Sequence, residues 1–267
     1  MAAQQGFLYE ENAYHALQRY KISTGGVAGA SHDKPDLSLV TKSIKTPAGC
    51  ELKISPTAAG SLVMKYYKGK WDYGDTKGDS EKELMKSIGI TYKLLDNMNK
   101  SGTAGKDWRD KIPVLQNDAS GKKVLALGFT DKRKAYAHDI KNFGGTNEVH
   151  IDVPAKAICD YYNKKKTQYL NVGTHGFFLM NKSDPLKLNS KLTTKIPDFA
   201  SSASARIRIR CQPKGGGDYQ FVMTLEFSKV SKSPYNLCPI ESPTNVSIKL
   251  SEYKTPANMQ LLLAFSQ

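Results

Sequence analysis

The first twenty residues have the spacing of a helix with one apolar face. Phe7, Tyr14 and Leu17 recur at intervals that place them on a single stripe of such a helix. Glu10 falls on the same stripe, whereas Glu11 is turned by about 100° and lies nearer its edge. We therefore expect a first helix that ends near residue 20 and carries a carboxylate among its apolar side chains.

Alternating apolar and polar residues predict two strands after this helix. Leu37 and Leu39 share one face of a strand over residues 36–40, and a second strand is predicted over residues 50–54. Turn-forming residues at 46–49 precede the second strand. We expect the two strands to lie side by side.

The rest of the chain mixes both patterns. Ser80 and Glu83 form a capping box that predicts a helix with an apolar face as far as Met98. A further helix is predicted to start at residues 152–154 and to end near Lys164. More strands are predicted at residues 123–129 (buried), 169–180, 205–212 and 219–227, with a glycine-rich turn between the last two. This pattern indicates the α/β class.

Composition is that of a globular protein. Of the 267 residues, 39% are hydrophobic and 24% are charged, which is unlike a disordered chain. No stretch approaches the roughly 18 apolar residues of a membrane helix. Residues 1–20 lack the basic start and the apolar core of a signal peptide. We therefore expect a cytoplasmic protein with no membrane partner.

The cysteines and histidines form no familiar metal motif. The sequence has four widely spaced cysteines and five isolated histidines, with no zinc-type ligand pair and no HExxH helix. A disulfide is the alternative to free thiols, and an intracellular protein favours free thiols. The nucleophile elbow, the P-loop and the dinucleotide-binding glycine fingerprint are also missing from the sequence.

Two carboxylates and one ammonium are expected to meet at one edge of the predicted sheet. Glu51 and Lys53 project together because residues two apart in a strand share a side, and strand pairing would bring Asp36 beside them. Carboxylate oxygens are ligands for Mg²⁺, which activates water and neutralises charge on a phosphate. The alternative is a solvated strand face, where Glu-x-Lys is a common pattern.

The order and spacing of these residues resemble the PD-(D/E)xK nuclease superfamily, which includes type II restriction endonucleases and Holliday junction resolvases. Pro35-Asp36 is followed, after fourteen residues, by Glu51-Leu-Lys53. The opening segment that ends at Glu10 resembles the first helix of that superfamily. The resemblance covers about a fifth of the chain.

The resemblance implies a role for each matching residue. Asp36 is the expected central metal ligand, Glu51 the second and the carbonyl of Leu52 a third. Lys53 is expected beside the attacking water. Glu10 is expected to support the metal from the helix, and the implied cofactor is Mg²⁺, which Mn²⁺ can replace.

The resemblance also implies an architecture, namely a restriction-endonuclease-like mixed β-sheet core flanked by helices, with additional C-terminal strands. Residues 1–100 are expected to form the catalytic core with the metal site. Residues 101–267 are expected to form a sheet extension and a DNA-gripping region of the same compact domain. Glu11 is the alternative to Glu10 in the metal site, unless it is simply a solvated helix residue.

The net charge of +14 lies mostly away from the expected metal site. Residues 1–60 carry a net charge of +1, whereas residues 121–215 carry +11. Such basic segments can hold phosphates. Three groups are expected to contact DNA: Lys132, Arg133 and Lys134; Lys164, Lys165 and Lys166; and Arg206, Arg208 and Arg210.

Two of these groups have structural alternatives. The lysine run near residue 165 also complements the C-terminal end of a helix dipole. The three arginines share one face of a strand, and they repel one another unless something anionic or acidic opposes them. An acidic neighbour would therefore serve as well as a phosphate.

Together these features predict a Mg²⁺-dependent endodeoxyribonuclease similar to type II restriction endonucleases. It would hydrolyse DNA phosphodiesters with a metal-activated water and leave 5′-phosphate ends, and a homodimer is expected by the same resemblance. The alternatives are a non-catalytic basic DNA-binding or packaging protein, and a junction-specific or RNA-directed nuclease of the same fold.

Overall fold

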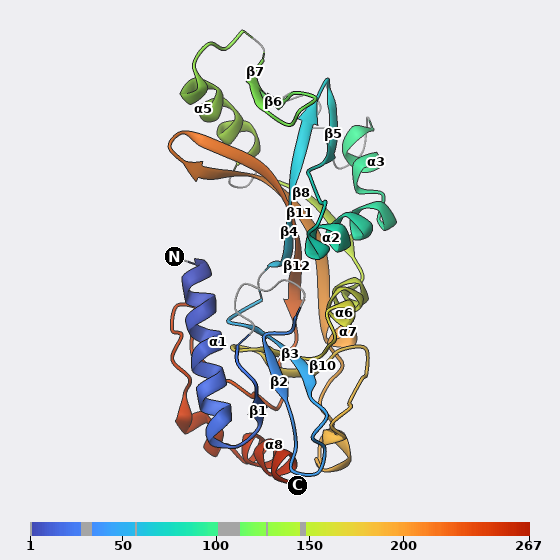
Figure 1. Cartoon of the computed structure of the whole chain (residues 1–267), viewed down its shortest axis with the longest axis vertical. Helices are drawn as coiled ribbons and strands as arrows, with labels where there is room; N and C mark the ends of the chain where they lie inside the picture. The colour runs from blue at the N-terminus through green and yellow to red at the C-terminus, as the bar shows by residue number, and fades with distance from the viewer. Residues whose placement is uncertain (1, 28–33, 57, 101–112, 127, 145–147) are drawn as a thin grey trace. The chain divides into compact units, whose positions relative to one another are not determined.

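The structure, a computed structural model, divides into two compact units (Figure 1). It describes residues 2–27, 34–56, 58–100, 113–126, 128–144 and 148–267. Unit 1 comprises Met1–Thr57, Pro154–Ala205 and Phe227–Gln267, and unit 2 comprises Ala58–Val153 and Arg206–Glu226. The first 100 residues therefore contribute to both units. The expected α/β class is confirmed, with helices and sheets in both units.

Unit 1 is built around a mixed five-stranded sheet. Its strands are, in spatial order, β1 (Ser23–Thr24), β2 (Leu37–Leu39), β3 (Ala48–Lys53), β9 (Thr167–Val172) and β10 (Gly176–Leu179). Neighbouring strands are antiparallel except for β3 and β9, which run parallel. The parallel pair joins segments that are far apart in the sequence.

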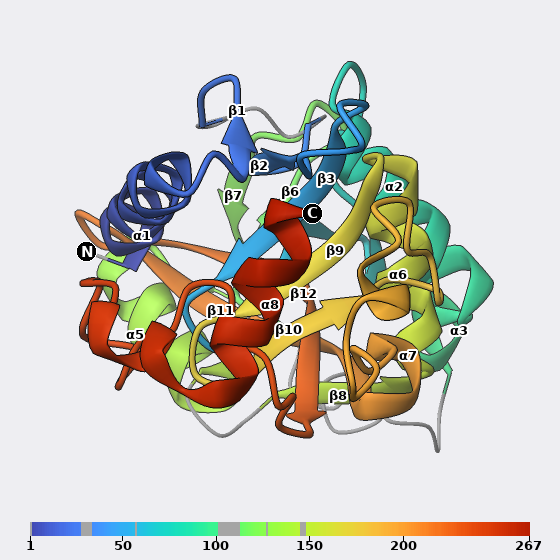
Figure 2. The same ribbon diagram turned by 90° about the horizontal axis from the view of Figure 1, so that it is seen from below.

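The helices of unit 1 pack on this sheet. They are α1 (Ala2–Arg19), α6 (Ala155–Lys164), α7 (Phe199–Ser202) and α8 (Pro256–Ser266), with short 3₁₀ segments η1 (Leu188–Ser190) and η2 (Leu250–Lys254). Figure 2 shows α8 lying across β9 and β10. Side chains of α1 and α8 share one apolar core with Leu37, Leu39 and Leu52 of the sheet.

The first helix is confirmed, but its buried stripe differs from the prediction. Phe7 is 47% exposed, whereas Tyr9 and Leu17 are buried. The stripe through Tyr9 packs into the apolar core of unit 1, and the Tyr9 hydroxyl donates a hydrogen bond to the Cys238 carbonyl at 2.6 Å, which satisfies a buried polar group. Glu10 consequently lies at the border of the buried face and is half-buried.

Gly49 makes a close approach possible at the start of β3. A Cβ built on this residue would clash with the backbone carbonyl of Lys166 and would lie 2.8 Å from the ring of Pro35. Only glycine leaves room for both neighbours. The chain at Pro35 and the chain at Lys166 therefore both approach β3 closely at this residue.

Unit 2 contains a second five-stranded sheet and a small hairpin. The spatial order is β5 (Lys70–Tyr73), β4 (Ala58–Tyr67), β12 (Asp218–Val230), β11 (Ala203–Gly215) and β8 (Val149–Val153), with β6 (Leu115–Asn117) and β7 (Lys123–Leu125) forming the hairpin. Strand β4 is antiparallel to both β5 and β12. The last residues of β12 and the first of β11 belong to unit 1.

Three helices of unit 2 show where the helix predictions succeed and fail. They are α2 (Ser80–Thr91), α3 (Leu94–Asn99) and α5 (Lys132–Phe143). The predicted capping box is wrong, because Asp79 is the N-cap and accepts a hydrogen bond from the Lys82 N–H at 3.1 Å. The predicted single helix is broken at Lys93, which has a left-handed backbone with φ 52°.

The strand predictions are confirmed in part. Strands β9 to β12 and the glycine turn between β11 and β12 are confirmed. The predicted buried strand at 123–129 is wrong, because among the described residues of this range only Lys123–Leu125 is a strand and its residues are partly exposed. All four cysteines are free, as expected, and all four are buried. Of the helices in the described ranges, none is long and apolar enough to cross a membrane.

Candidate active site

The end of β3 brings three of the predicted site residues together. Asp36 directly precedes β2, and its Oδ2 accepts a hydrogen bond from the Leu52 N–H at 2.7 Å. Lys53 Nζ lies 2.8 Å from Glu51 Oε1 on the same face of β3. Asp36 and Glu51 are only 7% and 2% exposed. The two carboxylates and the ammonium form a buried cluster and not a solvated strand face.

Glu10 brings a third carboxylate to this cluster from α1. Its Oε2 is buried and has no hydrogen-bond partner among the described residues. Burial raises the pKa of Glu10 to about 7, with Lys53 opposing the shift and Glu51 adding to it. Glu11 is exposed, which fits its alternative interpretation as a solvated helix residue. A buried carboxylate oxygen without a partner is the kind of group that a cation would satisfy.

The carboxylates also disfavour one another's ionised forms. Burial raises the pKa of Asp36 well above its usual value, and the nearby Glu51 and Glu10 carboxylates raise it further. Neighbouring carboxyl groups in a low-dielectric space keep their protons to higher pH unless a positive charge stabilises their ionised forms. The cluster therefore has an excess of negative charge when all three carboxylates are ionised.

Lys53 keeps its charge in this environment. Burial alone would lower the pKa of its ammonium, but Glu51, Tyr162 and Asp36 outweigh burial and raise that pKa above its usual value. Its Nζ lies 5.8 Å from the centre of the Tyr162 ring. The side chain is thus a partly buried ammonium held against Glu51, and its expected place beside an attacking water stays a prediction.

Lys165 is a further member of the cluster that the sequence interpretation placed elsewhere. It follows the last residue of α6, is 8% exposed and places its Nζ 3.4 Å from Glu51 Oε2. Its neighbours Lys164 and Lys166 are exposed. The prediction that all three lysines contact DNA is therefore wrong for Lys165, because its ammonium pairs with a buried carboxylate.

The donor atoms of the cluster suit a hard divalent cation. Asp36, Glu51 and Glu10 supply carboxylate oxygens, the ligand type that Mg²⁺ and Mn²⁺ prefer. The two backbone groups of a strand residue point to the same side, so the Leu52 carbonyl faces the side on which its N–H meets Asp36. Lys53 and Lys165 approach both oxygens of Glu51. As the side chains lie, no group of three or more His, Cys, Asp or Glu among the described residues is arranged to hold a metal.

The row of arginines on β11 lies in unit 2 and has acidic partners. Arg206 Nε lies 3.2 Å from Glu226 Oε2, and Arg208 Nε lies 2.9 Å from Glu226 Oε1 and 3.5 Å from Glu148 Oε2. The opposite face carries buried Ile207, as predicted. The arginines therefore do not need a phosphate to offset their mutual repulsion. Arg210 has a buried Nε without a hydrogen-bond partner among the described residues.

A cluster of cations surrounds the start of α5, also in unit 2. Lys132, Arg133 and Lys134 occupy the first turn of the helix and are exposed. Asp218 pairs with Lys123 Nζ at 2.5 Å and lies 3.7 Å from Lys132 Nζ. We call Lys123, Lys132, Arg133 and Lys134 the basic cluster. Positive side chains at a helix N-terminus oppose the helix dipole, so this arrangement does not stabilise the helix by itself.

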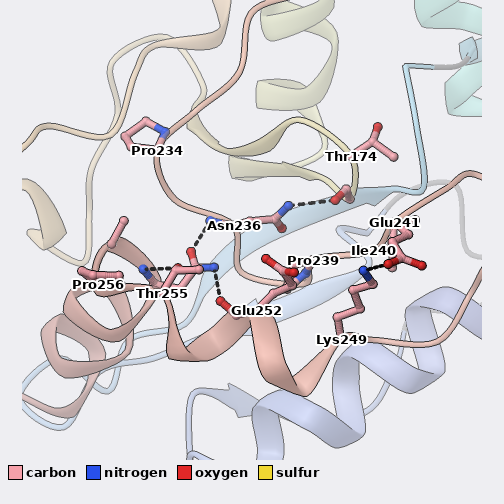
Figure 3. A pocket seen from close by; sticks show the side chains of 13 residues that line it. Thr174, Pro234, Asn236, Pro239, Ile240, Glu241, Lys249, Glu252, Thr255 and Pro256 are labelled. Carbon is pink, nitrogen blue, oxygen red and sulfur yellow. Dashed lines mark hydrogen bonds and ion pairs between the residues drawn. The ribbon is translucent and has the colours of Figure 1, made fainter.

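A pocket of about 570 Å³ lies elsewhere in unit 1, beside the turn between β9 and β10 (Figure 3). Its polar side chains bond mainly to the pocket wall. Asn258 accepts from the Asn236 N–H at 2.7 Å and donates to the Glu252 carbonyl at 2.8 Å, and Asn236 donates to the Gly173 carbonyl at 2.8 Å. Lys249 pairs with Glu241. These contacts hold the loops together and leave few groups for a ligand.

Comparison of the chain with protein-family models, with curated proteins and with solved structures finds no match.

Proposed function

We propose that this chain is a metal-dependent endonuclease that hydrolyses DNA phosphodiester bonds. The observation that carries the proposal is the convergence of Glu10, Asp36, Glu51 and Lys53 from three separate elements on one buried point. The order and spacing of these residues in the sequence, which resemble the PD-(D/E)xK superfamily, support the same function.

Each residue of the cluster would have its own role in this reaction. Asp36, Glu51 and the Leu52 carbonyl would hold a Mg²⁺ or Mn²⁺ ion, and Glu10 would support it from α1. When bound, the ion supplies activation of water and neutralisation of phosphate charge. Lys53 places a permanent ammonium beside Glu51, where it can orient the attacking water and offset negative charge on the phosphate.

Overall, the reaction adds water across one phosphodiester. The water oxygen bonds to phosphorus, the bond from phosphorus to the 3′ oxygen breaks, and that oxygen takes up a proton. The products are a 5′-phosphate and a 3′-hydroxyl. The groups proposed to contact the phosphate backbone are the exposed members of the basic cluster in unit 2, Lys132, Arg133 and Lys134, and the exposed residues Lys164 and Lys166 of unit 1.

The direct test is cleavage of supercoiled plasmid, linear duplex, four-way junction and RNA in Mg²⁺, in Mn²⁺ and in a chelator. We expect metal-dependent nicking or linearisation of DNA, and loss of cleavage in Lys53→Met. Lys86→Met, which removes a lysine of α2 in unit 2, is the control and should cut like the wild type. Cleavage of RNA alone, or of junctions alone, would identify the alternative substrate class.

A non-catalytic DNA-binding protein is the second candidate, and one observation favours it. Lys53 and Lys165 already compensate Glu51, so the cluster can exist as a buried structural network without a metal. This function predicts DNA binding that is unaffected by a chelator and no cleavage of any of the four substrates. Equal cleavage by wild type and Lys53→Met would instead show that the active site lies elsewhere.

A further inference from the structure

We propose that Lys165 is a positioning residue that acts through Glu51: it holds one Glu51 oxygen in the metal-free protein and competes with a divalent cation for that oxygen. The inference rests on the proposed function, because it concerns the same buried cluster. It assigns Lys165 a role distinct from that of Lys53, although both ammonium groups contact the same carboxylate.

The two lysines hold Glu51 unequally. Lys53 Nζ lies 2.8 Å from Oε1 and donates a well-formed hydrogen bond, whereas Lys165 Nζ lies 3.4 Å from Oε2. A charged hydrogen bond weakens beyond about 3 Å. The Oε2 contact is therefore the easier of the two to exchange for another cation.

The ammonium of Lys165 also lies near two aromatic rings. Its Nζ lies 5.5 Å from the ring centre of Tyr162 and 6.0 Å from that of Tyr161. Aromatic faces attract an ammonium at this range. The rings therefore stabilise the ammonium in the position from which it contacts Glu51, so Glu51 is not its only source of stabilisation.

The local charges explain why such a competitor is useful. Three carboxylates and two ammonium groups lie in this cluster, so with all three carboxylates ionised the lysines offset two of the three negative charges. A divalent cation would give the same site an excess of positive charge unless one ammonium moves away. Removal of the Lys165 charge should therefore strengthen cation binding, by about tenfold on the scale of one partly screened repulsion between neighbouring charges.

Calorimetric titration of the full-length protein with Mn²⁺ tests this inference. We expect Lys165→Met to bind Mn²⁺ about tenfold more tightly than the wild type, although cleavage of DNA need not improve. Lys164→Met and Lys166→Met are matched controls, because they remove the same charge from adjacent exposed positions and should change the affinity by less than about twofold. Lys165→Arg should restore the wild-type affinity.

Two results of this titration would overturn the inference. Unchanged or weaker Mn²⁺ binding by a folded Lys165→Met overturns the inference, as does a lack of Mn²⁺ binding by both wild type and variant. If Lys165→Met does not fold, Lys165→Gln keeps a hydrogen-bond donor for Glu51 without the charge and is held to the same expectation. Wild-type protein that binds Mn²⁺ but cuts no nucleic acid overturns the proposed nuclease function and leaves the result on Lys165 intact.

Discussion

Strands β3 of unit 1 and β11 of unit 2 both carry charged side chains at every second position, but the two rows differ in what surrounds them. Glu51 and Lys53 of β3 face two more carboxylates, and at least one carboxylate oxygen in that cluster has no partner among the described residues. On β11, Arg206 and Arg208 share the carboxylate of Glu226. In the described part of the chain, the unpaired atom beside the first row is a carboxylate oxygen of Glu10, whereas in the second row Arg206 and Arg208 are paired with Glu226 and the unpaired atoms belong to cations.

The comparison shows that charge spacing along a strand does not by itself indicate a binding site. Strand geometry places the side chains on one face in both cases. The deciding factor is whether neighbouring strands supply opposite charges, which depends on the tertiary structure. A buried charged group that its neighbours leave without a partner is the stronger indication of a ligand.

The largest expected effect comes from Asp36→Asn. The change keeps the size of the side chain and removes a carboxylate whose ionisation is opposed by burial and by Glu51, so the melting temperature should stay the same or rise. Cleavage of plasmid in Mg²⁺ should fall by about 100-fold or more, since a metal ligand matters at least as much as its supporting groups. The surface change Asp160→Asn is the control, and equal loss in both variants would refute the site.

The basic cluster should give the next largest effect. Replacing Lys132, Arg133 and Lys134 with glutamine should reduce the slope of log affinity against log salt by about 0.9 for each phosphate contact that is lost. Arg206→Gln should leave the slope nearly unchanged, because Arg206 is paired with Glu226. Fluorescence anisotropy with labelled duplex DNA measures both, and a larger change for Arg206→Gln would reverse the comparison.

A smaller effect is expected for Glu226→Gln. The substitution leaves Arg206 and Arg208 without their shared carboxylate, and hydrogen bonds to charged groups contribute about 1.5–3 kcal/mol. We expect the free energy of unfolding, measured in urea, to fall by about this amount while DNA cleavage persists. Stability like that of the wild type together with altered DNA affinity would show that these arginines serve DNA and not the sheet.

The smallest effect concerns pH and Glu10. Because its pKa is raised to about 7 in the folded protein, the metal-free native state keeps a proton that the unfolded chain releases at lower pH. Stability of the metal-free protein should therefore decline as pH rises from about 4.5 to about 7, and Glu10→Gln should flatten this decline. Denaturation midpoints at several pH values in a chelator provide the measurement, with Glu11→Gln as the exposed control.

The sequence was informative where function depends on local spacing. Leu37, Leu39 and the alternation of Glu51 with Lys53 follow from the two-residue period of a strand, and they are confirmed in β2 and β3. The stripe of α1 was misplaced because two apolar stripes were available, and the contact of Tyr9 with the distant Cys238 decided between them.

Lys165 could not be placed from the sequence for a similar reason. It enters the site because β9, which begins two residues later, pairs in parallel with β3. Nothing in the lysine run distinguishes its middle member from the exposed residues on either side. The acidic partners of Arg206 and Arg208 were likewise hidden, since Glu226 reaches them only through the β11–β12 hairpin.

Gly49 has no functional group, yet it determines how closely the reactive parts of unit 1 can approach. Pro35 and Lys166, which it accommodates, are the immediate chain neighbours of Asp36 and Lys165. A methyl group at this position would act as a spacer that pushes both segments away from β3. Substitutions at Gly49 should therefore disable the site while every charged residue remains in the chain, and a survey limited to charged residues would overlook the position that determines their separation.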